Sequence, residues 1–281
     1  MSTLPPGPDW QPNDPAQQPG YPPPPQGYYP QQATPTPAGD PLVPADFGGW
    51  FDLVIGVVRR SWVPLLLIQL VVAVISAVYS LVLRGLDGTE VGTFIGVSLL
   101  SVVVLLAIGM FAQGASVFIA IRDAAGEQTT PAVALGFAAT RALPLLGWSF
   151  LAGLLMVLGF VALIVPGLYL AIVFFATLTG VVTVEQGGLG RCFTLVHRRF
   201  WPTAGRILLY GLISVSYFIL VNVVVGLLVG ADSAAATLLE QVLTIPLSLA
   251  GVGVAVVTYA ELRFHERPDV RTPTLAAELR H

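Results

Sequence analysis

Few side chains in this sequence are of the types that catalyse reactions or hold metal ions. Metal and phosphodiesterase sites need clustered histidine, aspartate, glutamate or cysteine ligands, whereas His197, His265 and His281 lie far apart in the sequence. The sequence also has no Gly-x-Ser-x-Gly motif, no phosphate-binding loop and no dinucleotide-binding fingerprint. We therefore expect no catalytic residues, no metal site and no cofactor.

Four arginines late in the sequence are the side chains best suited to binding a ligand. Arg191, Arg198, Arg199 and Arg206 offer planar guanidinium groups that pair well with phosphate. Contact with anionic lipid headgroups at the inner leaflet is one interpretation, and ordinary anchoring of an interfacial helix by positive charge is the other. Nearby Glu185 is the candidate acid or base for a lipid-modifying enzyme, with ion pairing to arginines as the alternative role.

Three amide side chains lie within strongly apolar segments: Gln69, Gln113 and Asn222. An amide in hydrocarbon seeks a partner, so one interpretation is hydrogen bonding between helices, at roughly 1 kcal/mol for each bond. The other is that these amides line a cavity for a neutral or lipid-like molecule. Asp, Glu, Lys and Arg are absent from the apolar segments, which argues against a proton-coupled pump.

The composition indicates that these polar groups lie in a membrane. Hydrophobic residues make up 55% of the 281 residues and charged residues only 10%, whereas soluble domains carry about 25% charged residues. The formal net charge of -3 gives no reason to expect nucleic-acid binding. We predict an all-α integral membrane protein in which short amphipathic interfacial helices lead into the membrane-spanning helices.

The hydrophobic pattern predicts six transmembrane helices within residues 46–265. The expected spans are 62–83, 91–121, 144–165, 168–184, 207–229 and 242–260. An amphipathic segment at 46–60 leads into the first span, and Pro166 and Gly167 separate the third span from the fourth. Because proline ends a helix and glycine permits a tight reversal, the third and fourth spans should form a close antiparallel hairpin that turns at Pro166-Gly167.

The two ends of the chain differ in composition from the apolar region. Residues 1–45 hold 15 of the 23 prolines and little that can be buried, so we expect a disordered cytoplasmic tail. This proline-rich tail either docks a proline-recognising partner protein or acts only as a solvating segment. Residues 266–281 are expected to form a cytoplasmic C-terminal tail.

The placement of arginine predicts the orientation in the membrane. With the N-terminus in the cytoplasm, twelve of the 13 basic residues fall in inner segments and only Arg84 falls in an outer one. The sequence therefore predicts a multi-pass protein of the plasma membrane with both termini in the cytoplasm. Each pair of spans follows an arginine-bearing inner segment, which indicates either three degenerate repeats or convergent interface chemistry.

One part of the chain resembles a known family. The residues that carry the resemblance are Ile164-Val165-Pro166-Gly167-Leu168-Tyr169, Glu185, Arg191-Cys192-Phe193-Thr194-Leu195-Val196 and Phe200-Trp201. They are similar to motifs of the membrane domain found in some glycerophosphoryl diester phosphodiesterases and in stand-alone bacterial membrane proteins. Cys192 stands where serine is usual, and an arginine replaces the glycine before Phe200-Trp201. The resemblance implies a six-helix membrane domain of actinobacterial type, without the catalytic domain and with no established activity.

These observations favour a non-catalytic membrane protein that binds lipid or a partner protein and supports the cell envelope. A transporter or permease for a neutral or lipid-like substrate is the first alternative, and it predicts a cavity lined by the amides named above. A lipid-modifying membrane enzyme that uses Glu185 is the second alternative.

Overall fold

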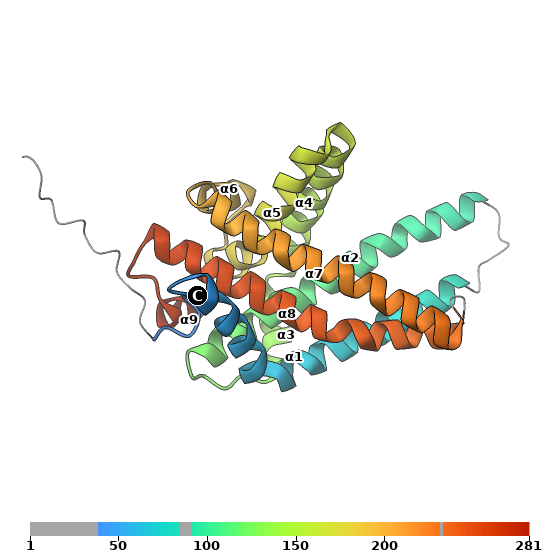
Figure 1. The fold of residues 1–281 in the computed structure, drawn as a ribbon, viewed down its shortest axis with the longest axis horizontal. Helices are drawn as coiled ribbons and strands as arrows, with labels where there is room; N and C mark the ends of the chain where they lie inside the picture. Colours follow the sequence, from blue (N-terminus) through green and yellow to red (C-terminus); the bar gives the residue numbers. More distant parts are fainter. Residues whose placement is uncertain (1–38, 85–90, 231–232, 281) are drawn as a thin grey trace, which may run out of the picture. The chain divides into compact units, whose positions relative to one another are not determined.

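The computed structural model describes residues 39–84, 91–230 and 233–280, and within these ranges the chain forms helices and no strand (Figure 1). The helices are α1 (Phe47–Arg84), α2 (Val91–Ala124), α3 (Pro131–Thr140), α4 (Ala142–Ala162), α5 (Ile164–Gly180), η2 (Val181–Glu185), α6 (Leu189–His197), α7 (Phe200–Val229), α8 (Ala234–Glu266) and α9 (Thr272–Glu278). The predicted all-α class is confirmed. Residues 1–38 of the predicted proline-rich tail lie outside the described residues.

Six helices in the described part of the chain are long and apolar enough to cross a membrane, as the sequence predicts. The apolar stretches are Phe47–Leu83, Val103–Ala124, Ala142–Ala162, Ile164–Glu185, Phe200–Val229 and Ala234–Glu266. Each overlaps one of the six predicted spans. The short helices α3 and α6 precede α4 and α7, where arginine-bearing lead-in segments are expected.

Helix α1 joins the predicted amphipathic segment to the first span without a loop. Ser61 has non-helical backbone angles (φ −107°, ψ 16°), and Pro64 follows inside the helix. Proline lacks a backbone N–H and its ring collides with the carbonyl group four residues earlier, so Pro64 bends α1 at this point. The segment before Ser61 and the span after it are therefore two arms of one bent helix.

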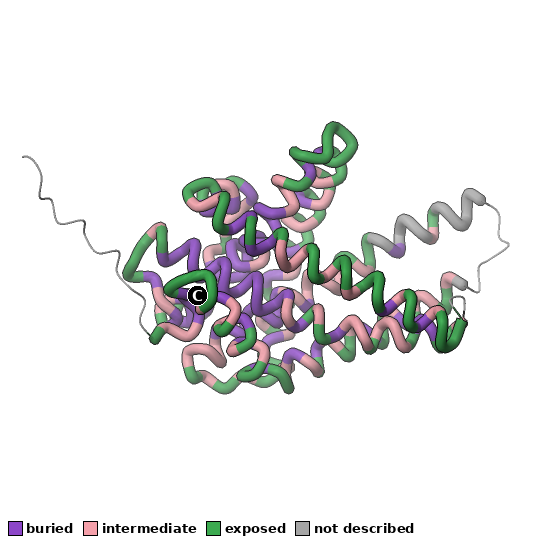
Figure 2. The backbone as a smooth tube through the Cα atoms, in the orientation of Figure 1, coloured by how far each residue is buried: buried purple, intermediate pink, exposed green. Residues whose placement is uncertain are grey.

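The buried core surrounds the C-terminal half of α8. Every residue from Gly251 to Phe264 is buried, and α8 packs against α1, α2, α5 and α7. Figure 2 shows buried residues gathered around this part of α8 and exposed residues along much of α7 and at the end of the α4–α5 hairpin. Large apolar side chains such as Leu227 and Leu228 of α7 are exposed, which suits a helix whose outer face contacts lipid.

The α4–α5 hairpin is present, but its turn lies earlier than predicted. Helix α4 ends at Ala162, Leu163 is extended (φ −164°, ψ 149°), and α5 begins at Ile164. Pro166 lies in the first turn of α5, where a helix offers no partner for the N–H that proline lacks. The prediction that the chain turns at Pro166-Gly167 is therefore wrong, because this proline starts a helix and does not end one.

Gly167 allows close packing within the hairpin. A methyl group added at Gly167 would lie 2.4 Å from the Phe160 ring of α4, and one added at Gly159 would lie 3.0 Å from Gly167 Cα. In Figure 1 the tip of the hairpin projects away from α7 and α8, while α5 also packs against both helices. The apolar tip is open to the surroundings, since Val161 is 81% and Val165 is 77% exposed.

The packed part of the chain extends beyond the predicted membrane domain at both ends. Leu42 and Val43 are buried, so the predicted boundary of the disordered tail 1–45 is wrong. Asp40 accepts hydrogen bonds from the backbone N–H of Thr272 at 3.1 Å and from its hydroxyl at 2.6 Å. Part of the predicted C-terminal tail is thus the docked helix α9. The burial of Leu42 and Val43 could not be predicted, because two apolar residues between prolines form no periodic pattern.

Substitution of Gly167 tests the close packing of the hairpin. Alanine stabilises a helix interior by about 0.5–1 kcal/mol relative to glycine, but at Gly167 its methyl group must displace the Phe160 ring. We expect Gly167→Ala to destabilise the protein by about 1–3 kcal/mol and to lower its thermal midpoint in detergent. Gly153→Ala is the control on the same hairpin, because its methyl group meets nothing within 4 Å. Equal midpoints for the two variants would contradict this packing.

Candidate functional site

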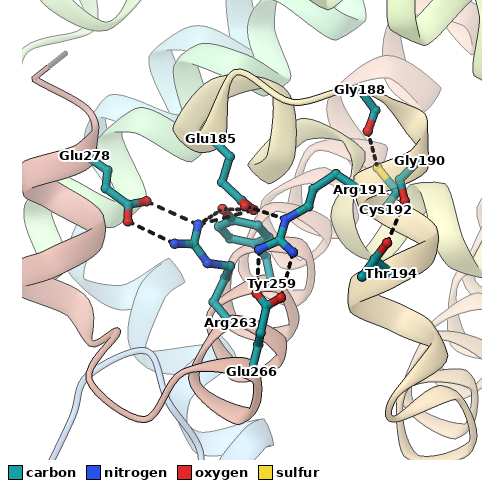
Figure 3. Close-up of polar contacts among 10 residues, drawn as sticks. All are labelled: Glu185, Gly188, Gly190, Arg191, Cys192, Thr194, Tyr259, Arg263, Glu266 and Glu278. Atoms are coloured by element: carbon teal, nitrogen blue, oxygen red, sulfur yellow. Dashed lines mark hydrogen bonds and ion pairs between the residues drawn. The ribbon is translucent and has the colours of Figure 1, made fainter.

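Five residues form an ion network where α6, η2, α8 and α9 meet (Figure 3). We call this end of the helices, which carries Arg191, Arg199, Arg206 and Arg263, the arginine-rich end. The network runs Glu266–Arg191–Glu185–Arg263–Glu278. Arg191 donates to Glu185 at 2.6 Å and to the two oxygens of Glu266 at 2.7 and 2.5 Å. Arg263 donates to the two oxygens of Glu278 at 3.2 and 2.9 Å and lies 3.2 Å from Glu185. The bonds to Glu266 are the main reason that the pKa of Arg191 is raised, so this guanidinium stays charged.

Glu185 reaches the centre of the network through an irregular turn. The π-helical turn η2 ends at Glu185, and Gln186 then adopts the left-handed conformation (φ 53°). The hydroxyl of Tyr259 donates to Glu185 at 2.9 Å and accepts from Arg263 at 2.8 Å. With two arginines and a tyrosine as partners, Glu185 shows the ion pairing that was one of its two predicted roles.

A buried ion pair connects α7 to α8. Arg206 and Glu261 form the pair, and their side chains are only 7% and 6% exposed. The Arg206 guanidinium also lies 5.7 Å from the ring centroids of Phe47 and Trp50 of α1, within the range of a cation–π contact. Trp50 Nε1 in turn donates to the hydroxyl of Thr258 at 3.2 Å. The pair therefore holds α1, α7 and α8 together.

The structure separates the four arginines that were predicted to contact lipid headgroups. The prediction is wrong for Arg206, which is buried against Glu261 because the two side chains compensate each other's charge. Arg191 is occupied by the ion network. Arg199 is partly exposed and lies 3.6 Å from Glu261. Arg198 is exposed and forms no ion pair within the part of the chain that the structure describes.

A cavity of about 530 Å³, which we call the amide cavity, lies among α1, α2, α4, α5, α7 and α8. Its wall contains no charged side chain and is mostly apolar. The polar residues in the wall are Gln69, Gln113, Thr179, Tyr210 and Ser248. Tyr210 donates to the carbonyl of Leu247 at 3.0 Å, and Ser248 donates to the carbonyl of Thr244 at 3.3 Å. These two hydroxyl groups are thus used within the protein.

The amides of Gln69 and Gln113 are left without such partners. Both side chains are half-buried in the cavity wall, and neither forms a hydrogen bond with any residue in the described ranges. Their place in the wall agrees with the second interpretation of the sequence, in which the amides line a cavity. Asn222 differs: it is also half-buried, but its amide donates to the carbonyl of Phe218 in its own helix at 2.8 Å. For Asn222 the structure supports neither interpretation, because the hydrogen bond that its amide donates stays within α7.

Neither the described side chains nor known proteins assign an activity to this arrangement. Within the described residues, no three His, Cys, Asp or Glu side chains are placed to hold a metal ion. No protein-family model, curated protein or solved structure matches the chain. The resemblance to the phosphodiesterase membrane domain stays a prediction.

The buried ion pair predicts a large cost when one partner is neutralised. Glu261→Gln keeps the shape of the side chain but leaves the charge of Arg206 buried and uncompensated, which destabilises a protein by about 3–5 kcal/mol. We expect a clear fall in the thermal midpoint of purified protein. Asp52→Asn is the control, because Asp52 is exposed on α1 and has no ion pair among the described residues. A midpoint as high for Glu261→Gln as for Asp52→Asn would contradict the role of the pair.

Cys192 provides a test of how α6 packs. It is the one cysteine of the chain, its side chain is fully buried, and burial raises the pKa of its thiol. Because the thiolate is the reactive form, the folded protein should resist N-ethylmaleimide at neutral pH and gain reactivity only at a pH above the ordinary thiol range. Unfolding in SDS should permit complete labelling, as measured by intact mass. Rapid labelling of the folded protein at neutral pH would contradict this packing.

Proposed function

We propose that this chain is a non-catalytic integral membrane protein that binds an uncharged, lipid-like molecule in the amide cavity. The observation that carries the proposal is the pair of amides, Gln69 and Gln113, in a mostly apolar wall and without a hydrogen bond to the described residues. An unpaired amide in apolar surroundings costs about 1–3 kcal/mol. A hydroxyl, ester or amide group of a ligand would remove this cost.

The wall of the cavity favours a neutral ligand. No aspartate, glutamate, lysine or arginine lines it, and a charge placed there without a partner would cost far more than a neutral polar group. Glu185, Glu261, Glu266 and Glu278, at the arginine-rich end, are engaged with arginines. Ligand selection by the amide cavity therefore rests on hydrogen bonding and shape.

The depth of the amides favours a ligand that arrives through the lipid. Gln69 follows the exposed Trp62 by seven residues on α1, which corresponds to about 10 Å along a helix. Indole rings concentrate at the boundary between hydrocarbon and water. If Trp62 marks this boundary, Gln69 lies inside the hydrocarbon region, where lipid-soluble molecules are abundant.

We place the arginine-rich end at the cytoplasmic face of the plasma membrane. The bias of twelve basic residues to one supports this orientation. The contact of Asp40 with Thr272 supports an arrangement with both ends of the chain on one side. The tail before residue 39 would then extend into the cytoplasm, where a proline-recognising protein could bind it.

Photolabelling by a neutral lipid tests this function. The probe is a photoactivatable diacylglycerol, presented to the protein in lipid nanodiscs. We expect the double variant Gln69→Leu/Gln113→Leu to be labelled about thirtyfold less, since two hydrogen bonds of about 1 kcal/mol each are lost. Asn222→Leu is the matched control, because it removes an intramembrane amide that lies outside the cavity.

Two results would contradict the proposal. One is equal labelling of the wild type and the double variant at equal thermal midpoints. The other is stronger labelling of the wild type by a photoactivatable phosphatidylglycerol, which is anionic, than by the diacylglycerol.

A further inference from the structure

A second cavity of about 500 Å³, which we call the apolar cavity, lies among α1, α2, α3 and α4. Its wall consists of aliphatic side chains, one proline and one phenylalanine. Val72 and Ala112 line both this cavity and the amide cavity. The two cavities are therefore adjacent, and a molecule that occupies both has to pass Val72 and Ala112.

We propose that the apolar cavity holds the hydrocarbon chain of the ligand whose uncharged head pairs with Gln69 and Gln113. The ligand class is then a neutral amphiphile of the monoacylglycerol or diacylglycerol type, with a hydrogen-bonding head and a flexible chain. This inference rests on the function proposed above. It adds a second contact region and a preference for chain length.

The two cavity walls differ in chemistry, so the head and the hydrocarbon chain of the ligand contribute differently to binding. A lipid chain is already in apolar surroundings, so its movement from the bilayer into the apolar cavity gains no hydrophobic free energy. What it gains is dispersion contacts with the wall and the high effective concentration that follows from attachment to a bound head. The head therefore decides which lipids bind, and the apolar cavity adds a moderate preference for chains long enough to fill it.

Ala107 offers a way to fill the apolar cavity without touching the amides. It lines the apolar cavity and is not part of the wall of the amide cavity. Its neighbour Leu106 on α2 is 49% exposed and lines neither cavity. Ala107→Trp therefore blocks the chain site, and Leu106→Trp adds the same ring to α2 on a face outside both cavities. Ala107→Leu is a milder block in case tryptophan prevents folding.

Photoactivatable monoacylglycerols of short, medium and long chain test the inference in nanodiscs. The readout is labelling of each variant relative to the wild type at each chain length, which cancels the partitioning of the probe into the bilayer. We expect Ala107→Trp to keep labelling by the short-chain probe and to lose about fivefold with the long-chain probe. Ala107→Leu should lose less, and Leu106→Trp should match the wild type throughout.

The outcomes separate this inference from the proposed function. If Ala107→Leu and any folded Ala107→Trp protein match the wild type at every chain length, while Gln69→Leu/Gln113→Leu loses labelling, the chain site is wrong and the proposed function stands. If Leu106→Trp loses long-chain labelling as strongly as Ala107→Trp, the apolar cavity is only a surface for bulk lipid, and the inference is overturned. If the double glutamine variant is labelled as strongly as the wild type, the proposed function fails as well.

Discussion

A charged side chain that leaves water needs a partner, and this requirement organises the arginine-rich end of the protein. Arg206 is compensated by Glu261 and by aromatic rings of α1, and Arg191 and Arg263 share Glu185. The partners come from different helices, so satisfying each charge also fixes α6, α7, α8 and α9 against one another. The dense core around the second half of α8 forms within this frame.

The same need for partners distinguishes the two glutamines in the wall of the amide cavity. Helix α8 connects the two regions, because Gly251 lines the cavity and Tyr259 and Arg263 belong to the arginine-rich end two to three turns further along. The hydroxyl groups that α7 and α8 contribute to the cavity wall are bonded to backbone carbonyls. The two glutamines of α1 and α2 are not bonded to the described residues. Two amides without such bonds in a mostly apolar wall are groups to which a neutral ligand could form hydrogen bonds.

The sequence predicted the helical class and the six spans because an uncharged apolar run of about 20 residues has the length that a helix needs to cross a bilayer. It did not locate the hairpin turn, since Pro166 fits both the end of one helix and the first turn of the next. It could not show that Arg206 is buried, because its partner Glu261 lies 55 residues away in the sequence. Polarity marked all three intramembrane amides, but only tertiary packing separates the glutamines in a cavity from Asn222, which bonds within its own helix.

A cryo-EM map of the protein in nanodiscs of its native membrane lipids would test the central claim most directly. The claim predicts density for a bound molecule within about 3 Å of both the Gln69 and the Gln113 amide, with no charged protein group beside it. A closed cavity, in which the two glutamines are bonded to each other or to neighbouring helices and no molecule is bound, would contradict it.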